Sequence, residues 1–258
     1  MTRDELALDS HRLLPRLLRN VDRVDSSVVL AGLELVAPLL PLAHSAAEGM
    51  EPGPAIVPAA ELLANRQRYR PASCVAGLSN DSMGNLIRLV RELAGLGVAA
   101  IALDLSNQAD TPPYGDNEWR PRSREELAEL RGAAGVPFWL SGIASADDAD
   151  VALEAGLDAV VVHSDTGRLI GGPAVIEVLP EVVDAVAGTM DVLAGGLVRN
   201  GIDAFRLLAV GADAVVIEGD RSMGHLVEEL QYAMRLTGCA SFADIGLDSV
   251  YAPLFGEA

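Results

Sequence analysis

The sequence predicts an α/β protein with the architecture of a (β/α)8 TIM barrel, and three observations lead to this prediction. Short apolar runs alternate with segments of helical length from residue 136 to residue 220, a pattern typical of a parallel sheet with crossover helices. The chain has 258 residues, close to the roughly 250 residues of one such barrel. Half of the residues are hydrophobic, which is enough for a large core. We therefore expect a single domain over residues 1–258.

The N-terminal part is predicted to supply a lead-in and the first two barrel strands. Leucines at near-helical spacing indicate a helical lead-in over about residues 1–27. Two short strands are expected within residues 28–42, and residues 38–43 form the first candidate barrel strand. A brief second strand at 56–57 precedes a helix over 61–69.

The middle of the chain continues the alternation of strand and helix. We expect the third strand at 73–78, a helix over 80–96 and the fourth strand at 98–105. The most polar stretch, Ser106–Ser123, follows that strand, and a helix over 124–134 comes next. A long loop after a barrel strand is typical of a lid or a substrate loop, and disorder is the alternative.

Two consecutive units follow, each with two expected strands. The strands of the first are at 138–140 and 159–162, and those of the second at 192–193 and 214–217. A last helix is expected over 223–237. In a parallel sheet, functional residues gather where the strands end. The candidates are the polar and glycine residues after these strands: Ser141, His163, Ser164, Asp165, Arg168, Gly195, Gly196, Arg199 and Glu218.

Composition excludes several classes of function. The net charge of −18 argues against nucleic acid and anionic membranes as partners, because phosphate binding requires a basic surface. No apolar run reaches the roughly 18 residues of a membrane span, and no secretory signal is visible, so we expect a cytoplasmic protein. All 19 basic residues are arginine, which excludes Schiff-base chemistry on lysine. The two cysteines form neither a metal motif nor a disulfide framework.

Two arginines near the strand ends are candidate anion ligands. Gly195 and Gly196 would let backbone N–H groups approach a phosphate, and Arg199 would add a fork of donors. The alternative is a tight turn that needs glycine for its backbone alone. Arg168 would hold an anionic substrate, or it would tie its loop to a neighbouring carboxylate.

His163 and Asp165 form a candidate acid/base pair, because strand alternation puts both on the same side of the chain. The alternative is a capping aspartate beside a hydrogen-bonded histidine. No compact metal-binding motif such as His-Glu-x-x-His is present, so we predict no metal site.

Three segments resemble the FMN-dependent 2-hydroxyacid oxidase and dehydrogenase family, which includes glycolate oxidase, lactate oxidase and mandelate dehydrogenase. They read LLPRLLRNVDRVDSSVVLAGLELVAPLLPLA (13–43), GRLIGGPAVIEVLPEVVDAV (167–186) and AGGLVRNGIDAFRLLAVGADAVVI (194–217). The segment 48–96 is shorter than its counterpart in the family. The resemblance implies a TIM barrel, FMN as cofactor, a small anionic substrate and a homo-oligomer.

The resemblance also implies roles for particular residues, with departures from the family pattern. The family's Ser-Asn-His-Gly-Gly-Arg run stands here as the six residues from His163 to Arg168. Arg168 therefore keeps the place of the carboxylate clamp, and Asp165 stands where the family has its proton-accepting histidine. Ser141 replaces the lysine beside the flavin ring. The residues implied to contact FMN are Ala43, Ser141, Gly195, Gly196, Arg199 and Gly219.

These departures decide the predicted function. An aspartate with an ordinary pKa near 3.9 is a weaker base at neutral pH than an imidazole near 6.5. We expect a divergent FMN-dependent oxidase- or dehydrogenase-like enzyme that acts on a small carboxylate. The alternatives are a barrel without flavin redox chemistry, in which Asp165 and His163 serve an isomerase, lyase or cyclase reaction, and a non-catalytic partner of an active relative.

Overall fold

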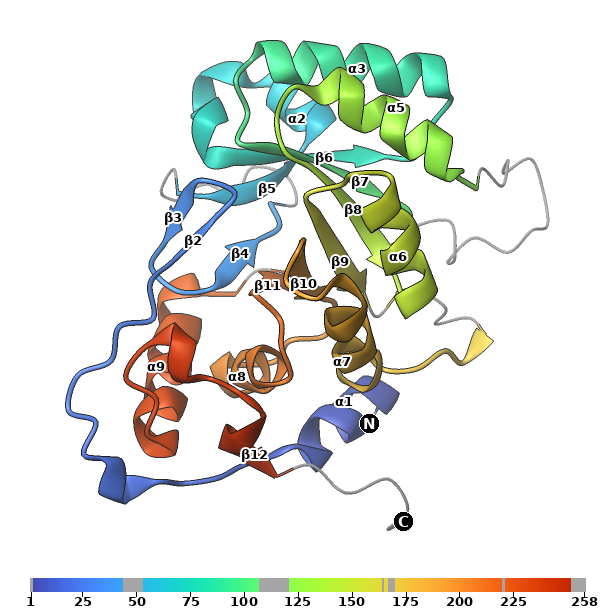
Figure 1. The fold of residues 1–258 in the computed structure, drawn as a ribbon. Helices are drawn as coiled ribbons and strands as arrows, with labels where there is room; N and C mark the ends of the chain where they lie inside the picture. The colour runs from blue at the N-terminus through green and yellow to red at the C-terminus, as the bar shows by residue number, and fades with distance from the viewer. Residues whose placement is uncertain are drawn as a thin grey trace.

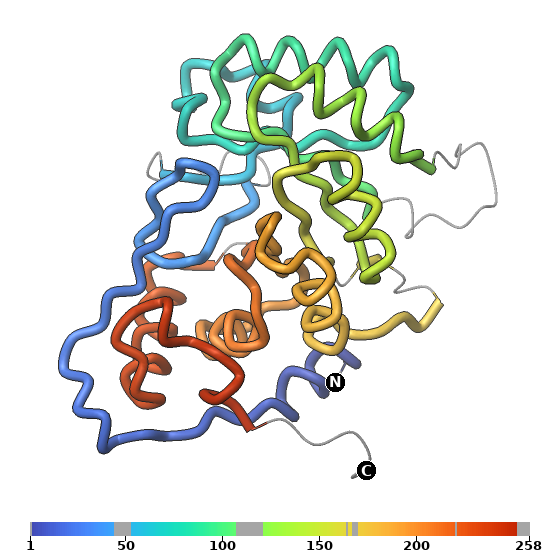
Figure 2. The backbone as a smooth tube through the Cα atoms, viewed as in Figure 1, coloured from blue at the N-terminus to red at the C-terminus, as the bar shows by residue number. Residues whose placement is uncertain are grey.

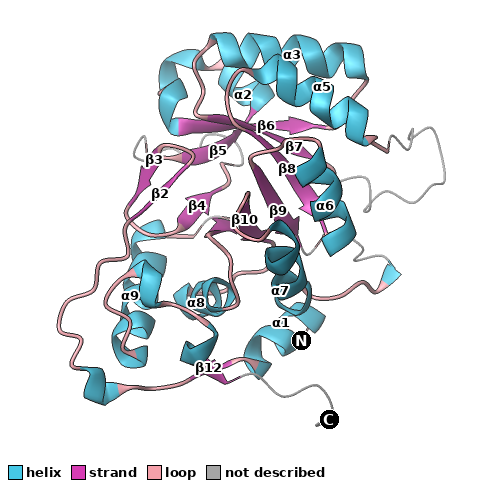
Figure 3. Cartoon of the chain, viewed as in Figure 1, coloured by secondary structure: helices cyan, strands magenta, loops and turns pink. Residues whose placement is uncertain are grey.

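The computed structural model describes residues 2–43, 53–106, 121–163, 165–166, 170–219 and 221–251. Eight strands form one parallel sheet in the order β4-β11-β10-β9-β8-β7-β6-β5, and helices surround it (Figure 3). This arrangement confirms the predicted (β/α)8 barrel. The strands are β4 (Leu39–Pro41), β5 (Ala55–Pro58), β6 (Cys74–Ser79), β7 (Ala100–Asp104), β8 (Phe138–Ile143), β9 (Ala159–His163), β10 (Asp191–Gly195) and β11 (Ala214–Ile217).

The ring closes between β4 and β5, which are the two edges of the sheet. In the described part of the chain, one bridge pairs Leu42 with Ile56 across this seam. The backbone N–H of Ala43 donates to the carbonyl oxygen of Ile56 at 2.8 Å. The seam is therefore held by far less backbone pairing than the neighbouring strand pairs.

Helices lie around the sheet (Figure 1), and α5, α6, α8 and α9 begin at residues whose side chains cap them. Ser123 and Glu126 form a capping box at the start of α5, and Asn200 and Ser222 cap α8 and α9. The helices are α2 (Ala59–Ala64), α3 (Met83–Gly95), α5 (Arg124–Ala134), α6 (Ala146–Glu154), α7 (Val175–Val186), α8 (Gly201–Ala209) and α9 (Met223–Thr237). The predicted helices over 124–134 and 223–237 have these same bounds.

The helix predicted over 61–69 is shorter and begins earlier. Helix α2 ends at Asn65, whose backbone leaves the helical region, and a separate 3-10 turn (Arg66–Arg68) follows. The side chain of Asn65 donates to the Glu61 carboxylate at 3.0 Å, and its backbone N–H donates to the Glu61 carbonyl oxygen at 2.9 Å as the chain leaves the helix.

Only α1 (Arg3–Ser10) is an α-helix within the predicted helical lead-in. The chain then forms β1 (Arg12–Leu13), which pairs antiparallel with β12 (Val250–Tyr251). The backbone N–H of Arg16 donates to Leu236 at 2.8 Å. Contacts with the distant C-terminal segment therefore replace the intrahelical hydrogen bonds that the leucine spacing indicated. Figure 2 shows this blue segment running along the outside of the red C-terminal part.

A hairpin closes the N-terminal end of the barrel. Strands β2 (Val28–Leu30) and β3 (Leu33–Leu35) carry buried leucines that pack in one cluster with Trp139. The remaining members of the cluster are small and aliphatic residues from the strands, and they fill the interior in the manner of a packed core. The open space of the barrel consequently lies at the C-terminal ends of the strands.

A bulge in β8 brings the end of β7 close to it. Gly142 has a φ of 92° and lies where the pairing of β8 with β9 shifts register. A side chain at Gly142 would collide with the backbone nitrogen of Ser106 and lie 2.9 Å from its Cα atom. Glycine is thus required at this position both for its backbone conformation and for the close approach of the β7 loop.

We expect Gly142→Ala to lower the free energy of unfolding by about 1–3 kcal/mol, because it combines an unfavourable φ with overpacking. Gly132→Ala is the matched control: Gly132 lies inside α5 with open space around its Cα. Alanine there should raise stability by about 0.5–1 kcal/mol through helix propensity. Urea denaturation of both variants measures the difference, and equal effects would contradict the prediction.

Candidate active site

Strand alternation places polar side chains at the mouth of the barrel. On β7, Ala100 and Ala102 point into the interior, and the next inward position is Asp104. On β9, Ala159 and Val161 point inward, and His163 follows them. The same period of two leads to Ser141 on β8 and to Glu218 after β11. The last inward position of each of these strands is therefore a polar residue.

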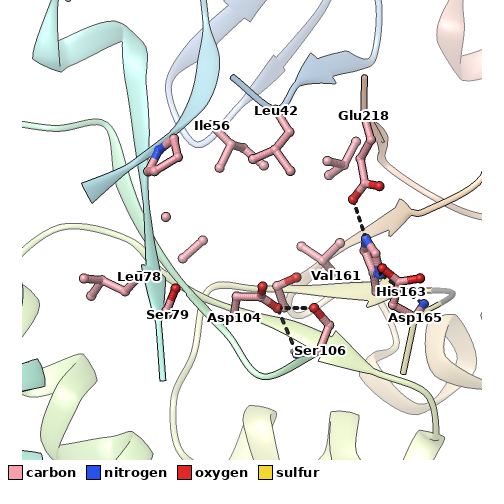
Figure 4. Close-up of a pocket in the computed structure, with 15 residues that line it drawn as sticks. Leu42, Ile56, Leu78, Ser79, Asp104, Ser106, Val161, His163, Asp165 and Glu218 are labelled. Atoms are coloured by element: carbon pink, nitrogen blue, oxygen red, sulfur yellow. Dashed lines mark hydrogen bonds and ion pairs between the residues drawn. The ribbon is translucent and has the colours of Figure 1, made fainter. Parts of the chain in front are cut away.

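These residues surround a cavity of about 360 Å³ at the C-terminal ends of the strands. Figure 4 shows Leu78 and Ser79 on one side of it and His163, Asp165 and Glu218 on the other. The residues that line the cavity are Leu42, Ile56, Pro58, Gly77, Leu78, Ser79, Ala102, Asp104, Ser106, Ser141, Val161, His163, Asp165, Val216 and Glu218.

His163 and Glu218 form a hydrogen-bonded pair in this cavity. The Nε2 atom of His163 lies 2.7 Å from Oε1 of Glu218. The Nδ1 atom of the same ring accepts the backbone N–H of Asp165 at 3.2 Å. A neutral ring that accepts at Nδ1 carries its proton on Nε2 and donates it to Glu218. Both ring nitrogens are thus engaged, and the imidazole is only 7% exposed.

The surroundings of His163 act on its pKa in opposite directions. Burial lowers the pKa, while the hydrogen bond and charge of Glu218 raise it, followed by the charges of Asp165 and Asp104. The carboxylates outweigh burial, so the pKa of His163 is raised above its ordinary value. The hydrogen bond from the Asp165 backbone favours the neutral ring, but the closer and charged Glu218 determines the direction.

Gly195 provides the space that the imidazole occupies. This glycine is the last residue of β10, between the strands that carry His163 and Glu218. A Cβ atom on Gly195 would lie 2.7 Å from Cδ2 of His163. The glycine predicted to admit an anion therefore lies directly beneath the histidine ring.

Asp104 organises the opposite part of the mouth. Its Oδ1 atom accepts the backbone N–H of Ser106 at 2.9 Å and the hydroxyl of Ser106 at 2.6 Å. Ser141, predicted beside a flavin ring, lines the same cavity from the adjacent strand. The structure thus brings Ser141, His163 and Asp165 together, as strand-end residues were expected to be.

Arg199 lies in a separate network of charges. Its guanidinium contacts Asp9 through Nη2 at 2.6 Å and Asp203 through Nε at 2.7 Å. Arg206 contacts Asp203 as well, at 2.7 Å. The side chain of Asp203 is fully buried, and the hydrogen bond from Arg199 holds the pKa of Asp9 below its ordinary value. Arg199 is not among the described residues that line the cavity.

The other predicted site residues have different positions. Ala43 lies at the seam of the barrel, and Gly196 and Gly219 have φ values of 103° and 79°, which favour glycine. Arg168 and most of the Ser106–Ser123 loop lie outside the described residues. The roles predicted for these residues stay predictions.

Residues 99–252, more than half of the chain, match the family described as FMN-dependent dehydrogenase. The chain belongs to this family. The match confirms the resemblance found in the sequence and agrees with a site at the strand ends of a barrel.

Three relatives in the family are named as hydroxyacid enzymes. A peroxisomal (S)-2-hydroxy-acid oxidase of Oryza sativa subsp. japonica is 38% identical over 138 residues, which is 48% of this chain and 38% of the rice protein. An L-lactate dehydrogenase of Chromohalobacter salexigens is 36% identical over 143 residues, 50% of this chain and 36% of that protein. An L-lactate oxidase of Nostoc sp. is 37% identical over 136 residues, 47% of this chain and 37% of that protein. The matched regions therefore span less than half of these relatives.

Solved structures share the fold over nearly the whole chain. A mandelate oxidase superposes with a TM-score of 0.78 at 24% sequence identity, covering 98% of this chain and 89% of that chain. A mandelate oxidase variant with a monooxide FMN adduct has the same TM-score and identity and covers 98% and 90%. At this level of identity, the likeness establishes the common barrel.

None of the helices among the described residues is long and apolar enough to cross a membrane. No group of three or more of the described His, Cys, Asp or Glu side chains is arranged to hold a metal ion.

Glu218 was a strand-end candidate in the sequence, but its pairing with His163 was not predicted. A signal was present, because the inward positions of β11 run from Ala214 and Val216 to Glu218 in steps of two. The pairing with His163 joins residues 55 positions apart and requires a glycine on the intervening strand. The predicted barrel already implied the order of these strands, but side-chain packing over Gly195, which periodicity does not give, was the missing information.

We expect Glu218→Gln to destabilise the protein at low pH more than at high pH. The raised pKa of His163 means that its stabilising contribution is present below about 6.5, the unfolded pKa, and is lost as the pH rises through the folded pKa. Loss of the charge-assisted hydrogen bond should cost on the order of 1–2 kcal/mol at pH 6. Thermal unfolding of wild type and variant from pH 5.5 to 9 measures this, and a difference that grows with pH would contradict it.

Proposed function

We propose that this chain is an FMN-dependent oxidoreductase of the 2-hydroxyacid oxidase and dehydrogenase type with an altered acid–base group. The observation that carries this proposal is the His163–Glu218 pair inside the cavity at the strand ends. Family membership supplies the class of reaction, and the cavity supplies the place where the reaction would occur. In parallel barrels, that end is where catalytic residues gather.

The cavity fits the ring system of FMN. A flavin ring has apolar faces and polar edges, and cofactor sites combine apolar walls with a few polar groups. Leu42, Ile56, Leu78, Val161 and Val216 form the apolar walls here, and the polar side chains lie between them. When bound, FMN supplies a two-electron acceptor, and the protein supplies binding and orientation.

The acid–base group consists of Asp165, His163 and Glu218. A substrate hydroxyl in the cavity would give its proton to the carboxylate of Glu218. The neutral His163 ring would not accept it, because Nε2 already carries a proton and Nδ1 accepts the Asp165 N–H. His163 positions Glu218 through the 2.7 Å contact. Proton acceptance is most favourable when His163 is neutral, so the rate should rise with pH through the His163 pKa.

The substrate in this proposal is a small 2-hydroxy carboxylate. Arg168 would hold its carboxylate, as the motif at this position implies. A guanidinium matches a carboxylate with two parallel hydrogen bonds.

We expect Glu218→Gln to slow substrate oxidation on the order of 100-fold, because it removes the carboxylate held by His163. The purified chain with added FMN is mixed anaerobically with glycolate, lactate or mandelate, and the loss of visible flavin absorbance is followed. Asp165→Asn should have a smaller effect. Asp248→Asn is the control, because Asp248 contacts Arg16 outside the cavity.

Two outcomes would count against the proposal. A wild-type rate in Glu218→Gln would exclude that residue as the proton acceptor. Flavin that stays oxidised with all three acids would contradict the redox function and favour the reading of the barrel as a non-redox enzyme or an inactive partner.

A further inference from the structure

We propose that the cavity recognises the ring of a flavin and not its phosphate, so that riboflavin and FMN bind with similar affinity. This inference rests on the proposed function, because it requires that a flavin binds at all. It concerns the donors that the sequence assigned to a phosphate, Arg199 and the Gly195–Gly196 turn, together with the backbone N–H groups at the start of α8.

The guanidinium of Arg199 is engaged on all three of its nitrogens. Nη1 and Nη2 donate to the two carboxylate oxygens of Asp9 at 3.1 and 2.6 Å. Nε and Nη2 donate to the two oxygens of Asp203 at 2.7 and 2.9 Å. Each aspartate is thus held in the bidentate geometry that a phosphate would need. A bound phosphate would have to displace at least one of them.

Arg206 makes this displacement more difficult. It contacts Asp203 at 2.7 Å and Asp9 at 3.2 Å, so two arginines and two aspartates neutralise each other. The side chain of Asp203 is fully buried and cannot move into water without opening the packing around it. The nearby Arg221 is engaged as well, since its Nη1 donates to the carbonyl oxygen of Arg199 at 2.6 Å.

The backbone donors at the start of α8 are also occupied. The N–H of Arg199 donates to Asp203 at 3.0 Å, the N–H of Gly201 donates to Glu229 at 2.7 Å, and the N–H of Asp203 donates to Asn200 at 2.9 Å. A helix N-terminus binds phosphate through such N–H groups. Here side chains of the chain itself accept these hydrogen bonds.

The glycine turn is covered from the cavity side. The His163 ring lies over Gly195, as the 2.7 Å distance from a built Cβ atom to Cδ2 indicates. Glu218 extends that cover, since it is hydrogen-bonded to Nε2, the ring atom next to Cδ2. An anion approaching Gly195 from the cavity would meet an imidazole and a carboxylate before it reached the backbone.

The test compares two flavins that differ by the phosphate alone. Protein freed of bound flavin is titrated with riboflavin and with FMN, and quenching of flavin fluorescence gives both dissociation constants. A site that clamps a phosphate with several charge-assisted hydrogen bonds should favour FMN by well over about tenfold. We expect a ratio of less than about tenfold.

Each outcome decides between the two proposals. A larger preference for FMN would overturn this inference and leave the proposed function standing. Failure of both flavins to bind would overturn the proposed function together with the inference. Binding of both at similar affinity supports both.

Asp9→Asn provides a variant that should restore the phosphate contact in part. The Asp9 side chain is 45% exposed, so its replacement should be tolerated, and it leaves Nη1 and Nη2 of Arg199 less strongly held. The FMN preference should rise several-fold, while riboflavin affinity stays unchanged and reports an intact cavity. Asp248→Asn removes a comparable exposed contact, to Arg16, and should change neither affinity. An unchanged FMN preference in Asp9→Asn would overturn the assignment of Asp9 as the group that occupies Arg199.

Discussion

The period of two along each parallel strand is the constraint on which the site depends. Residues that fill the interior of the barrel determine, two positions later, which side chain reaches its mouth. Ala100 and Ala102 lead to Asp104, and Ala159 and Val161 lead to His163. A shift of one residue in any of these strands would turn the polar group towards the helices. The apolar core therefore fixes the chemistry of the opening.

The pairing of His163 with Glu218 adds a second constraint, which involves three strands. Neighbouring strands lie about 4.8 Å apart, so the strands on either side of β10 are roughly 9.6 Å apart. Two long side chains can meet across that distance only when the residue between them is small. Gly195 meets this condition, and any larger residue there would push the imidazole away from Glu218. A glycine that resembles part of an anion site thus has a structural function in this chain.

The sequence predicted the barrel well because apolar alternation is a local signal. The helices over 124–134 and 223–237 were predicted with the observed bounds for the same reason. The N-terminal lead-in was harder to predict, because Arg16 makes its backbone hydrogen bond with Leu236. Ser141, His163 and Asp165 were found as strand-end residues. The engagement of Arg199 was not foreseeable from its motif, because Asp9 lies 190 positions earlier in the chain.

The seam between β4 and β5 has a consequence for local opening of the barrel. Local opening of a protein occurs where backbone pairing is sparse, at a free energy well below that of global unfolding. Leu42 and Ile56, which form the bridge at the seam, are also wall residues of the cavity. Transient separation of β4 and β5 would widen the cavity at its side wall. Exchange of the Ala43 amide proton with solvent would then measure how often β4 and β5 separate.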